Sequence, residues 1–240
     1  MSGIIVENLS FGYGSKQALD DVSFSVGKGQ FTALLGPNGA GKSTLFALLT
    51  RLFVTQTGTV SIAGHDIKTA PSAALKHIGV VFQQLTLDMD LTVVQNLRYF
   101  AALQGISGRQ ANSRIQEVLE QVQMAERGHE PVRKLNGGHR RRAEIARSLI
   151  HTPSVLLLDE PTVGLDPQTR TGITQHVHDL AMDQGLTVLW ATHLADEVHD
   201  KDQLVILDKG RVRASGKTGD IRQGKDLATY FIALTSGDHP

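Results

Sequence analysis

Residues 135–166 read LNGGHRRRAEIARSLIHTPSVLLLDEPTVGLD, and this stretch decides the fold. A double-glycine turn and a cationic helix precede an apolar strand, which ends in the adjacent acids Asp159 and Glu160. A carboxylate at the carboxyl end of a parallel strand lies where ligands bind in such sheets. The stretch therefore predicts an α/β core with acidic groups at a ligand-binding edge.

A second glycine-rich turn lies upstream, where residues 36–44 read GPNGAGKST and fit the phosphate-loop pattern G-x-x-x-x-G-K-[ST]. Glycines let the backbone N–H groups of such a loop converge on phosphate oxygens, and Lys42 adds positive charge. Residues 30–35 predict a strand that leads into the loop, and residues 42–53 predict a helix that follows it. The apolar face of this helix is expected to carry Leu45, Leu48, Leu49 and Leu52.

Continuous apolar runs predict further strands of the core. Residues 155–158 and 187–190 suit parallel strands that are buried on both faces. Residues 166–183 predict a helix between these strands, which Gly185 ends. The alternation of strand and helix indicates an α/β fold with a parallel sheet.

Two other parts of the chain have a different pattern. Residues 91–123 are helical throughout, with Gly105 and Gly108 as the break between two helices. An antiparallel layer (4–11, 22–26 and 57–63) and a closing hairpin (202–215) are expected from the remaining apolar runs.

The composition excludes several classes of protein. Of 240 residues, 40% are hydrophobic and 20% are charged, which is typical of a globular protein and not of a disordered one. Lys+Arg and Asp+Glu both number 24, so the bulk charge gives no sign of nucleic-acid binding. Cysteine is absent, which excludes disulfides and thiolate metal sites. No run of about 18 apolar residues occurs, and the first residues do not form a signal peptide, so we expect another polypeptide to supply any channel.

In this order, the two glycine turns and the acid-tipped strand resemble the ATPase subunits of ATP-binding cassette (ABC) transporters. The resemblance implies the P-loop NTPase fold of these ATPases, with a parallel core sheet, an N-terminal antiparallel β-layer and an inserted helical subdomain. It implies one domain over residues 3–233, with the helical subdomain at about 86–150. A polar C-terminal tail is expected at 234–240.

The resemblance also implies where ATP and Mg²⁺ bind. Tyr13 matches the aromatic residue that stacks on adenine, and Glu160 and His193 match the general base and the residue that contacts the γ-phosphate. The magnesium ligands would be Ser43, Gln83 and Asp159. The phosphates would be held by Gly36, Pro37, Asn38, Gly39, Ala40, Gly41, Lys42, Ser43 and Thr44.

The family's LSGGQ signature has a different form in this chain. It consists of Leu135, Asn136, Gly137, Gly138 and His139. In the family, the signature holds the γ-phosphate bound to the opposite subunit, and the amide of Asn136 can still donate a hydrogen bond there. A signature that binds without assisting turnover is the alternative. Asp166 matches the loop that crosses the dimer interface.

The implied partners are a second copy of the chain and separate transmembrane permease subunits, at the cytoplasmic face of the cell membrane; no nucleic acid is expected. LTVVQNLRYFAALQG (91–105) and DEPTVGLDPQTR (159–170) look closest to drug- or lipid-exporter ATPases of the ABC-2 type. The LNGGHRRR form resembles a branch found beside PQQ-dependent (quinoprotein) alcohol dehydrogenase systems. The three arginines in it are expected to lie on a solvated helix face.

One other function stays open: a soluble single-cassette ATPase of an assembly system, such as iron–sulphur biogenesis, since one fold hosts several functions. Translation factors of this superfamily usually carry two cassettes. Chromosome-maintenance ATPases interrupt the cassette with long heptad arrays, which are absent between residues 42 and 135. A nucleotide sensor without hydrolysis would lack Glu160 or His193, and both are present.

Overall fold

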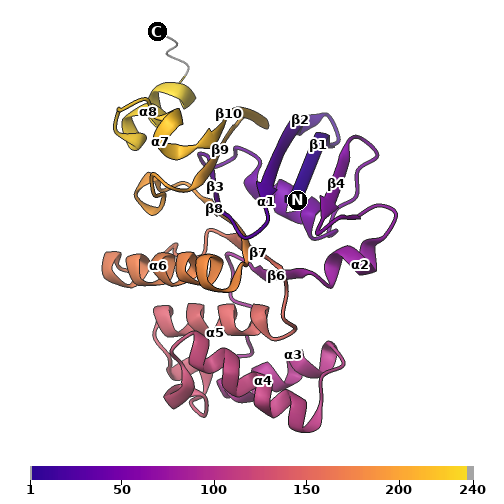
Figure 1. Cartoon of the computed structure of the whole chain (residues 1–240), viewed down its shortest axis with the longest axis vertical. Helices are drawn as coiled ribbons and strands as arrows, with labels where there is room; N and C mark the ends of the chain where they lie inside the picture. Colours follow the sequence, from indigo (N-terminus) through magenta and orange to yellow (C-terminus); the bar gives the residue numbers. More distant parts are fainter. Residues whose placement is uncertain (1, 237–240) are drawn as a thin grey trace.

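The computed structural model describes residues 2–236, which form a six-stranded and a four-stranded sheet with helices around them (Figure 1). The larger sheet has the order β10-β9-β3-β8-β7-β6. All its strands are parallel except β10, which confirms the predicted parallel core. Its strands are β3 (Phe31–Leu35), β6 (Ile78–Val81), β7 (Val155–Asp159), β8 (Thr187–Thr192), β9 (Gln203–Asp208) and β10 (Arg211–Lys217).

The smaller sheet is antiparallel and has the order β2-β1-β4-β5, as the N-terminal layer was expected to have. Its strands are β1 (Ser2–Tyr13), β2 (Lys16–Gly27), β4 (Thr59–Ile62) and β5 (His65–Asp66). Successive residues of a strand point to opposite faces. Leu157 therefore packs with the smaller sheet, whereas Leu156 and Leu158 pack against the helices.

The helices between β6 and β7 gather at one end of the molecule (Figure 1), where α5 lies against both β6 and α6. Within the range 86–150, this group contains α3 (Val93–Leu103), α4 (Gly108–Gln121), η1 (Ala125–Arg127), η2 (Val132–Lys134) and α5 (Gly137–Leu149). Thr92 caps α3 in a capping box with Gln95, and Gly105 turns the chain between α3 and α4 with φ 75. The division of the chain into a core and a helical subdomain stays a prediction.

The helix after the glycine loop is shorter than predicted. It runs as α1 (Lys42–Leu49) and not to residue 53, so Leu52 is 66% exposed and does not share the buried face of Leu45, Leu48 and Leu49. Arg51 ends the helical path with φ 58, and its guanidinium donates to the carbonyl oxygens of Ile67 and Lys68. These contacts with a distant segment turn the chain, and leucine spacing cannot reveal them.

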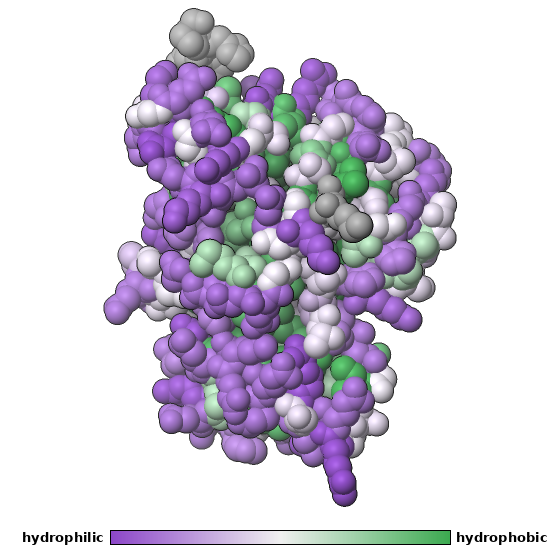
Figure 2. Space-filling model, viewed as in Figure 1, coloured by the Kyte–Doolittle hydropathy of each residue, from purple (hydrophilic) through white to green (hydrophobic). Residues whose placement is uncertain are grey.

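The chain is completed by four other helices. These are α2 (Pro71–Leu75), α6 (Pro167–Gln184), α7 (Thr218–Ile221) and α8 (Leu227–Thr235), together with η3 (Ala195–Glu197). Helix α8 continues past the predicted start of the polar tail at 234, and residues 237–240 of that tail lie outside the described residues. Within residues 2–236, no helix is both long enough and apolar enough to cross a membrane. The face in Figure 2 is mainly hydrophilic, with hydrophobic residues in separate patches.

Candidate functional site

Three neighbouring core strands end at one cleft. The glycine loop follows β3, Asp159 ends β7 and Glu160 follows it, and His193 follows β8. The cleft has a volume of about 920 Å³. Its lining comes from Tyr13, Lys16, Gln17, Ala18, Asn38, Gly39, Gly41, Lys42, Ser43, Thr44, Gln83, Glu160, Val163, His193, Lys209 and Gly210.

The glycine loop is shaped by close backbone contacts. A Cβ at Gly36 would lie 2.4 Å from the carbonyl oxygen of Leu207, so only glycine fits there. Gly41 has φ 109 and caps α1 without a side-chain hydrogen bond to the helix. The first N–H groups of α1 therefore have no capping side chain, and the positive end of the helix opens toward the cleft. This arrangement suits an anion.

Lys42 is buried beneath the loop and has several oxygen partners. Its Nζ donates to the carbonyl oxygens of Gly36 at 2.7 Å and Pro37 at 3.2 Å. It also lies 3.2 Å from Oε1 of Glu160. The ammonium group thus joins the loop after β3 to the acid after β7.

Glu160 is held in an unusual backbone conformation at the end of β7. Its φ is 46, and its N–H donates to the carbonyl oxygen of Ala191 at 3.0 Å. The carboxylate accepts a hydrogen bond of 3.4 Å from Nε2 of Gln83. Nδ1 of His193 lies 3.4 Å from Oε1 without forming a hydrogen bond. Three side chains far apart in sequence, those of Lys42, Gln83 and His193, thus approach this carboxylate.

Asp159 has the properties of a ligand for a hard divalent cation. It is buried, and its Oδ1 has no hydrogen-bond partner among the described residues. Burial raises the pKa of this carboxyl, as does the charge of Glu160, whereas a hydrogen bond with the Ser43 side chain and the charge of Lys42 lower it. A buried carboxylate with a free oxygen beside a hydroxyl fits Mg²⁺, which prefers oxygen ligands. Ser43 and Gln83 both line the cleft, and Asp159 lies beside Ser43.

Tyr13 lies at the rim of the cleft in a cluster of aromatic rings. It is 49% exposed, and its ring contacts Phe11 at 5.2 Å and Phe53 at 5.7 Å, both edge to face. Its hydroxyl lies 3.3 Å from Oγ1 of Thr44. The ring is thus accessible and tied to the start of α1.

The five residues of the signature do not line the cleft in the part of the chain that the structure describes. Asn136 is exposed and caps α5, because its Oδ1 accepts from the N–H of His139 at 2.8 Å. The Nδ2 group of the same amide is left as a donor. A Cβ on Gly138 would lie 2.5 Å from Thr169, and one on Gly137 2.9 Å from Leu165, so the two glycines permit close packing.

Asp166, the predicted interface residue, is exposed and caps α6. Its carboxylate accepts from the N–H of Thr169 at 2.9 Å, and the hydrogen bonds from Thr169 lower the pKa of Asp166. Since Gly137 and Gly138 contact the segment from Leu165 to Thr169, the N-terminal ends of α5 and α6 lie side by side. One surface of the chain thus carries both the signature and the predicted interface loop.

The arginine run of α5 is not the solvated face that the sequence predicted. Arg141 is buried and donates to the carbonyl oxygens of Phe82 at 2.7 Å and Gln83 at 2.9 Å. Arg140 bonds to the carbonyl of Val132 and Arg142 to that of Val122. The expectation was wrong because each guanidinium finds backbone carbonyls on a different neighbouring segment.

Two of the histidines, His178 and His199, lie near the carboxylate of Asp202, away from the cleft. Nε2 of His178 lies 3.0 Å from both oxygens of Asp202, and His199 is close to the same carboxylate. The rings of His178 and His199 are stacked at 4.2 Å, with 16° between their planes. The nitrogen lone pairs of the two imidazoles lie in the planes of their rings. Because these planes are nearly parallel, the lone pairs do not point at one ion. This arrangement is a stacked hydrogen-bonded group and not a formed metal site.

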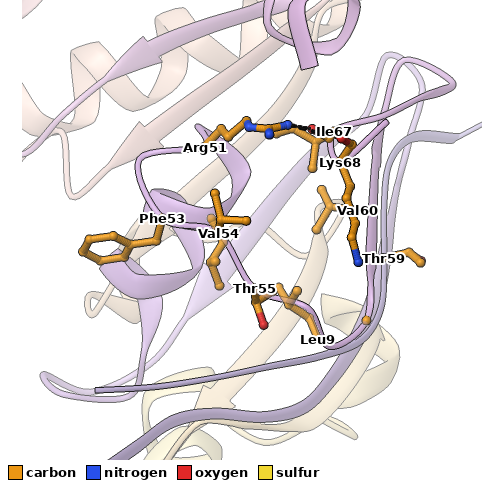
Figure 3. Close-up of a pocket in the computed structure, with 11 residues that line it drawn as sticks. Leu9, Arg51, Phe53, Val54, Thr55, Thr59, Val60, Ile67 and Lys68 are labelled. Atoms are coloured by element: carbon orange, nitrogen blue, oxygen red, sulfur yellow. Dashed lines mark hydrogen bonds between the residues drawn. The ribbon is translucent and has the colours of Figure 1, made fainter. Parts of the chain in front are cut away.

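A second, much smaller hollow of about 40 Å³ lies beyond the end of α1. Figure 3 shows Arg51 reaching toward Ile67 across this hollow, with Leu9 and Val60 at its wall and Phe53 pointing away. Its volume is close to that of a single water molecule, so it holds no nucleotide.

Sequence reasoning missed two cations of the cleft, Lys16 and Lys209. Each stands beside a hairpin turn, between β1 and β2 or between β9 and β10. The N–H of Gly210 donates to the carbonyl oxygen of Ala40 at 2.9 Å, so the second turn lies against the glycine loop. The sequence reveals the turn at Lys209 and Gly210, but not that this turn lies against the glycine loop.

Comparison with known proteins agrees with this geometry. The ABC transporter family matches residues 19–163. The linearmycin resistance ATP-binding protein LnrL of Bacillus subtilis (strain 168) is 37% identical over 95% of this chain and 73% of its own length. The Nod factor export ATP-binding protein I of Ralstonia nicotianae is 40% identical over 90% of this chain and 67% of its own length.

Solved structures of ATP-binding cassettes superpose on most of the chain. The cbiO1 protein of Clostridium perfringens, part of the ABC transporter complex cbiONQ, superposes with a TM-score of 0.86 at 27% identity, over 97% of this chain and 95% of its own. A dimeric ATP-binding cassette in a post-hydrolysis state, bound to ADP and Pi, gives a TM-score of 0.78 at 26% identity, over 90% and 98% of the two chains.

Proposed function

Because the chain belongs to the ABC transporter family, we propose that two copies of it bind two ATP molecules head to tail between them. The chain is an ATP-binding subunit and an ATPase of that family. One observation supports the head-to-tail arrangement: the phosphate cleft and the signature are separate in a single chain, and the signature caps an exposed helix end. A second copy supplies the missing signature to each cleft.

Each cleft binds the phosphates of one ATP on the glycine loop. The uncapped N–H groups at the start of α1 donate to phosphate oxygens, and Lys42 exchanges the carbonyl of Pro37 for the β- and γ-phosphates. The adenine stacks on the accessible ring of Tyr13. Ser43, Asp159 and Gln83 would hold Mg²⁺, which would supply positive charge to neutralise the phosphates.

Glu160 acts as the general base of hydrolysis. Its carboxylate accepts a proton from water, whose oxygen bonds to the γ-phosphorus while the bond from that phosphorus to the ADP oxygen breaks. His193, beside Glu160, donates to an oxygen of the γ-phosphate. The products are ADP and phosphate. Once the γ-phosphate is released, nothing bridges the cleft of one copy and the signature of the other, so the dimer opens.

The signature and the interface loop contact the partner's nucleotide together. Asn136 keeps its oxygen on the N–H of His139 and donates through Nδ2, and Gly137 and Gly138 bring the start of α5 close to the γ-phosphate. Asp166 lies beside them at the start of α6 and crosses the interface.

The motion of the dimer powers transport through separate transmembrane permease subunits, at the cytoplasmic face of the membrane. Export is the direction we propose, since related proteins are named for resistance to linearmycin and for Nod factor export. These relatives do not favour an assembly ATPase. Similarity to the branch found beside quinoprotein alcohol dehydrogenase systems stays a prediction.

The test is ATP-dependent dimerisation of the purified Glu160→Gln chain, measured by light scattering with Mg²⁺ and either ATP or ADP. The mass doubles with ATP and stays that of a monomer with ADP, because only ATP carries the bridging γ-phosphate. A monomer under both conditions contradicts the head-to-tail site. Co-purification in detergent with a multi-span membrane protein encoded beside the chain tests the permease partner.

A further inference from the structure

One face of α5 carries three charged side chains that hold the backbone of residues 80–87. We name Arg141, Glu144 and Arg147 the α5 clamp; they stand three residues apart and so lie on one side of the helix. Residues 80–87 include the end of β6 and continue through Gln83.

Two members of the α5 clamp, Glu144 and Arg147, form an ion pair. Glu144 is fully buried and accepts from the N–H groups of Thr86 and Leu87. Nε of Arg147 lies 3.1 Å from Glu144, and Nη2 of Arg147 donates to the carbonyl oxygen of Val80 at 2.7 Å. Buried charges are retained only when they are paired and hydrogen-bonded, as these are.

The third member of the α5 clamp, Arg141, contacts the backbone beside the cleft. Arg141 donates through its two terminal nitrogens to the carbonyl oxygens of Phe82 and Gln83. The side chain of Gln83 continues to Glu160 with a hydrogen bond of 3.4 Å. A chain of direct contacts thus leads from α5 to the proposed general base.

The other end of α5 is the signature. Asn136 caps the helix, and Arg141 stands in its second turn, so the signature and the clamp share one hydrogen-bonded element. In the proposed dimer, the signature touches the partner's ATP, while Gln83 and Glu160 act on the ATP in the chain's own cleft.

We propose that Arg141 is a positioning residue that couples the two ATP sites of the dimer. When the signature engages the partner's γ-phosphate, α5 shifts, and Arg141 carries the backbone of Gln83 with it toward Glu160. Occupation of one site thereby readies the other, so hydrolysis is cooperative in ATP. The inference rests on the proposed head-to-tail dimer.

The test is the ATP dependence of hydrolysis by the purified chain and its Arg141→Ala variant. We expect a Hill coefficient that falls from about two, the number of coupled sites, to about one. Light scattering in the Glu160→Gln background should show that the variant still dimerises with ATP, and titration of the monomer should show unchanged ATP affinity. Arg141→Lys, which offers one point charge in place of a two-pronged donor, should give an intermediate Hill coefficient.

Arg142→Ala is the matched control, because Arg142 is the next residue of α5 and bonds to Val122 and Gln123, not to residues 80–87. Its Hill coefficient should equal that of the unmodified chain. If Arg141→Ala does not fold, as judged by its thermal transition, Arg141→Lys decides the question. Cooperativity that survives both Arg141 variants, or that Arg142→Ala abolishes equally, overturns the role of Arg141. An unmodified chain that shows neither ATP-driven dimerisation nor cooperativity overturns the dimer itself, and the coupling with it.

Discussion

The glycine loop and the signature are both glycine turns that begin a helix, but the two helices begin differently. Helix α1 starts at Gly41 with no capping side chain, and the walls of the cleft surround it. Helix α5 starts at Asn136, whose oxygen caps it, and this end is exposed. An uncapped helix end with Lys42 beneath it is a complete anion site. A half-capped end in solvent offers fewer donors, which fits its proposed role of completing a site that lies on another copy of the chain.

The largest effect is expected when the cleft keeps its shape but loses its base. Glu160→Gln should retain ATP binding and lose turnover by roughly a hundredfold or more, because the amide cannot accept the proton of water. Phosphate release by the purified variant measures this loss. Glu130→Gln changes a partly exposed acid that is paired with Arg127; this variant is the control and should hydrolyse ATP normally. Turnover near that of the unmodified chain would remove Glu160 from its role.

Loss of the buried cation should weaken ATP binding by the single chain, before any dimer forms. Lys42→Ala removes the charge opposite the β- and γ-phosphates and should reduce ATP affinity by about tenfold to a hundredfold, the effect of a charged hydrogen bond. Fluorescence titration with a labelled ATP analogue measures this affinity. Lys201→Ala, at an exposed position that does not line the cleft, should not change this affinity. Equal affinities in the two variants would mean that the glycine loop is not the main site.

ATP-driven dimerisation should depend on the charge of the side chain at position 136, even when that side chain still caps α5. Asn136→Asp keeps a good capping oxygen, so α5 should stay folded, but it places a carboxylate against phosphate. ATP-driven dimerisation in the Glu160→Gln background should weaken by about tenfold or more through like-charge repulsion. Asn136→Ser, which keeps a cap and a donor, should dimerise and should retain or raise ATPase activity. If the aspartate variant dimerises like its parent, the signature does not touch nucleotide.

The smallest effect concerns stability. Since burial raises the pKa of Asp159 above its unfolded value of 3.8, its ionised form destabilises the fold, and stability falls as pH rises through that value to the folded pKa. Asp159→Asn should therefore raise the melting temperature at pH 7, by about 2–4 °C per kcal/mol gained. It should also lose the extra stabilisation that Mg²⁺ gives with ATP. Asp166→Asn should change stability in the opposite direction, because hydrogen bonds lower the pKa of Asp166. A fall in the melting temperature of Asp159→Asn would contradict this account.

Local patterns predicted the strands and helices around the cleft well, because the phosphate loop and the acid-tipped strand each combine a motif with its flanking elements. The parallel order then brings the ends of β3, β7 and β8 together, and with them Lys42, Glu160 and His193. The carboxyl ends of neighbouring parallel strands lie at the same end of a sheet, so the residues that follow these strands must lie close together.

Features that depend on contacts between distant segments could not be predicted. Lys209 lines the cleft only because β9 pairs with β3, and the chain between them is long. Arg141 looks like its neighbours Arg140 and Arg142 in the sequence, yet successive residues of a helix point in different directions, and only tertiary contacts decide which is buried. The early end of α1 at Leu49 has the same cause, since Arg51 bonds to carbonyls of a later segment.

Strand β10 forms one edge of the core sheet and, within residues 2–236, pairs with β9 alone. A bare strand edge is a template on which strands of other molecules can add. Arg211, Arg213 and Lys217 alternate along β10 and are exposed, and the first two are paired with Asp20 and Asp208, so two such edges would bring charged side chains together. We expect the consequence to be colloidal: removing these charged groups from water is costly, so crowded copies of the chain should resist growing into continuous sheets.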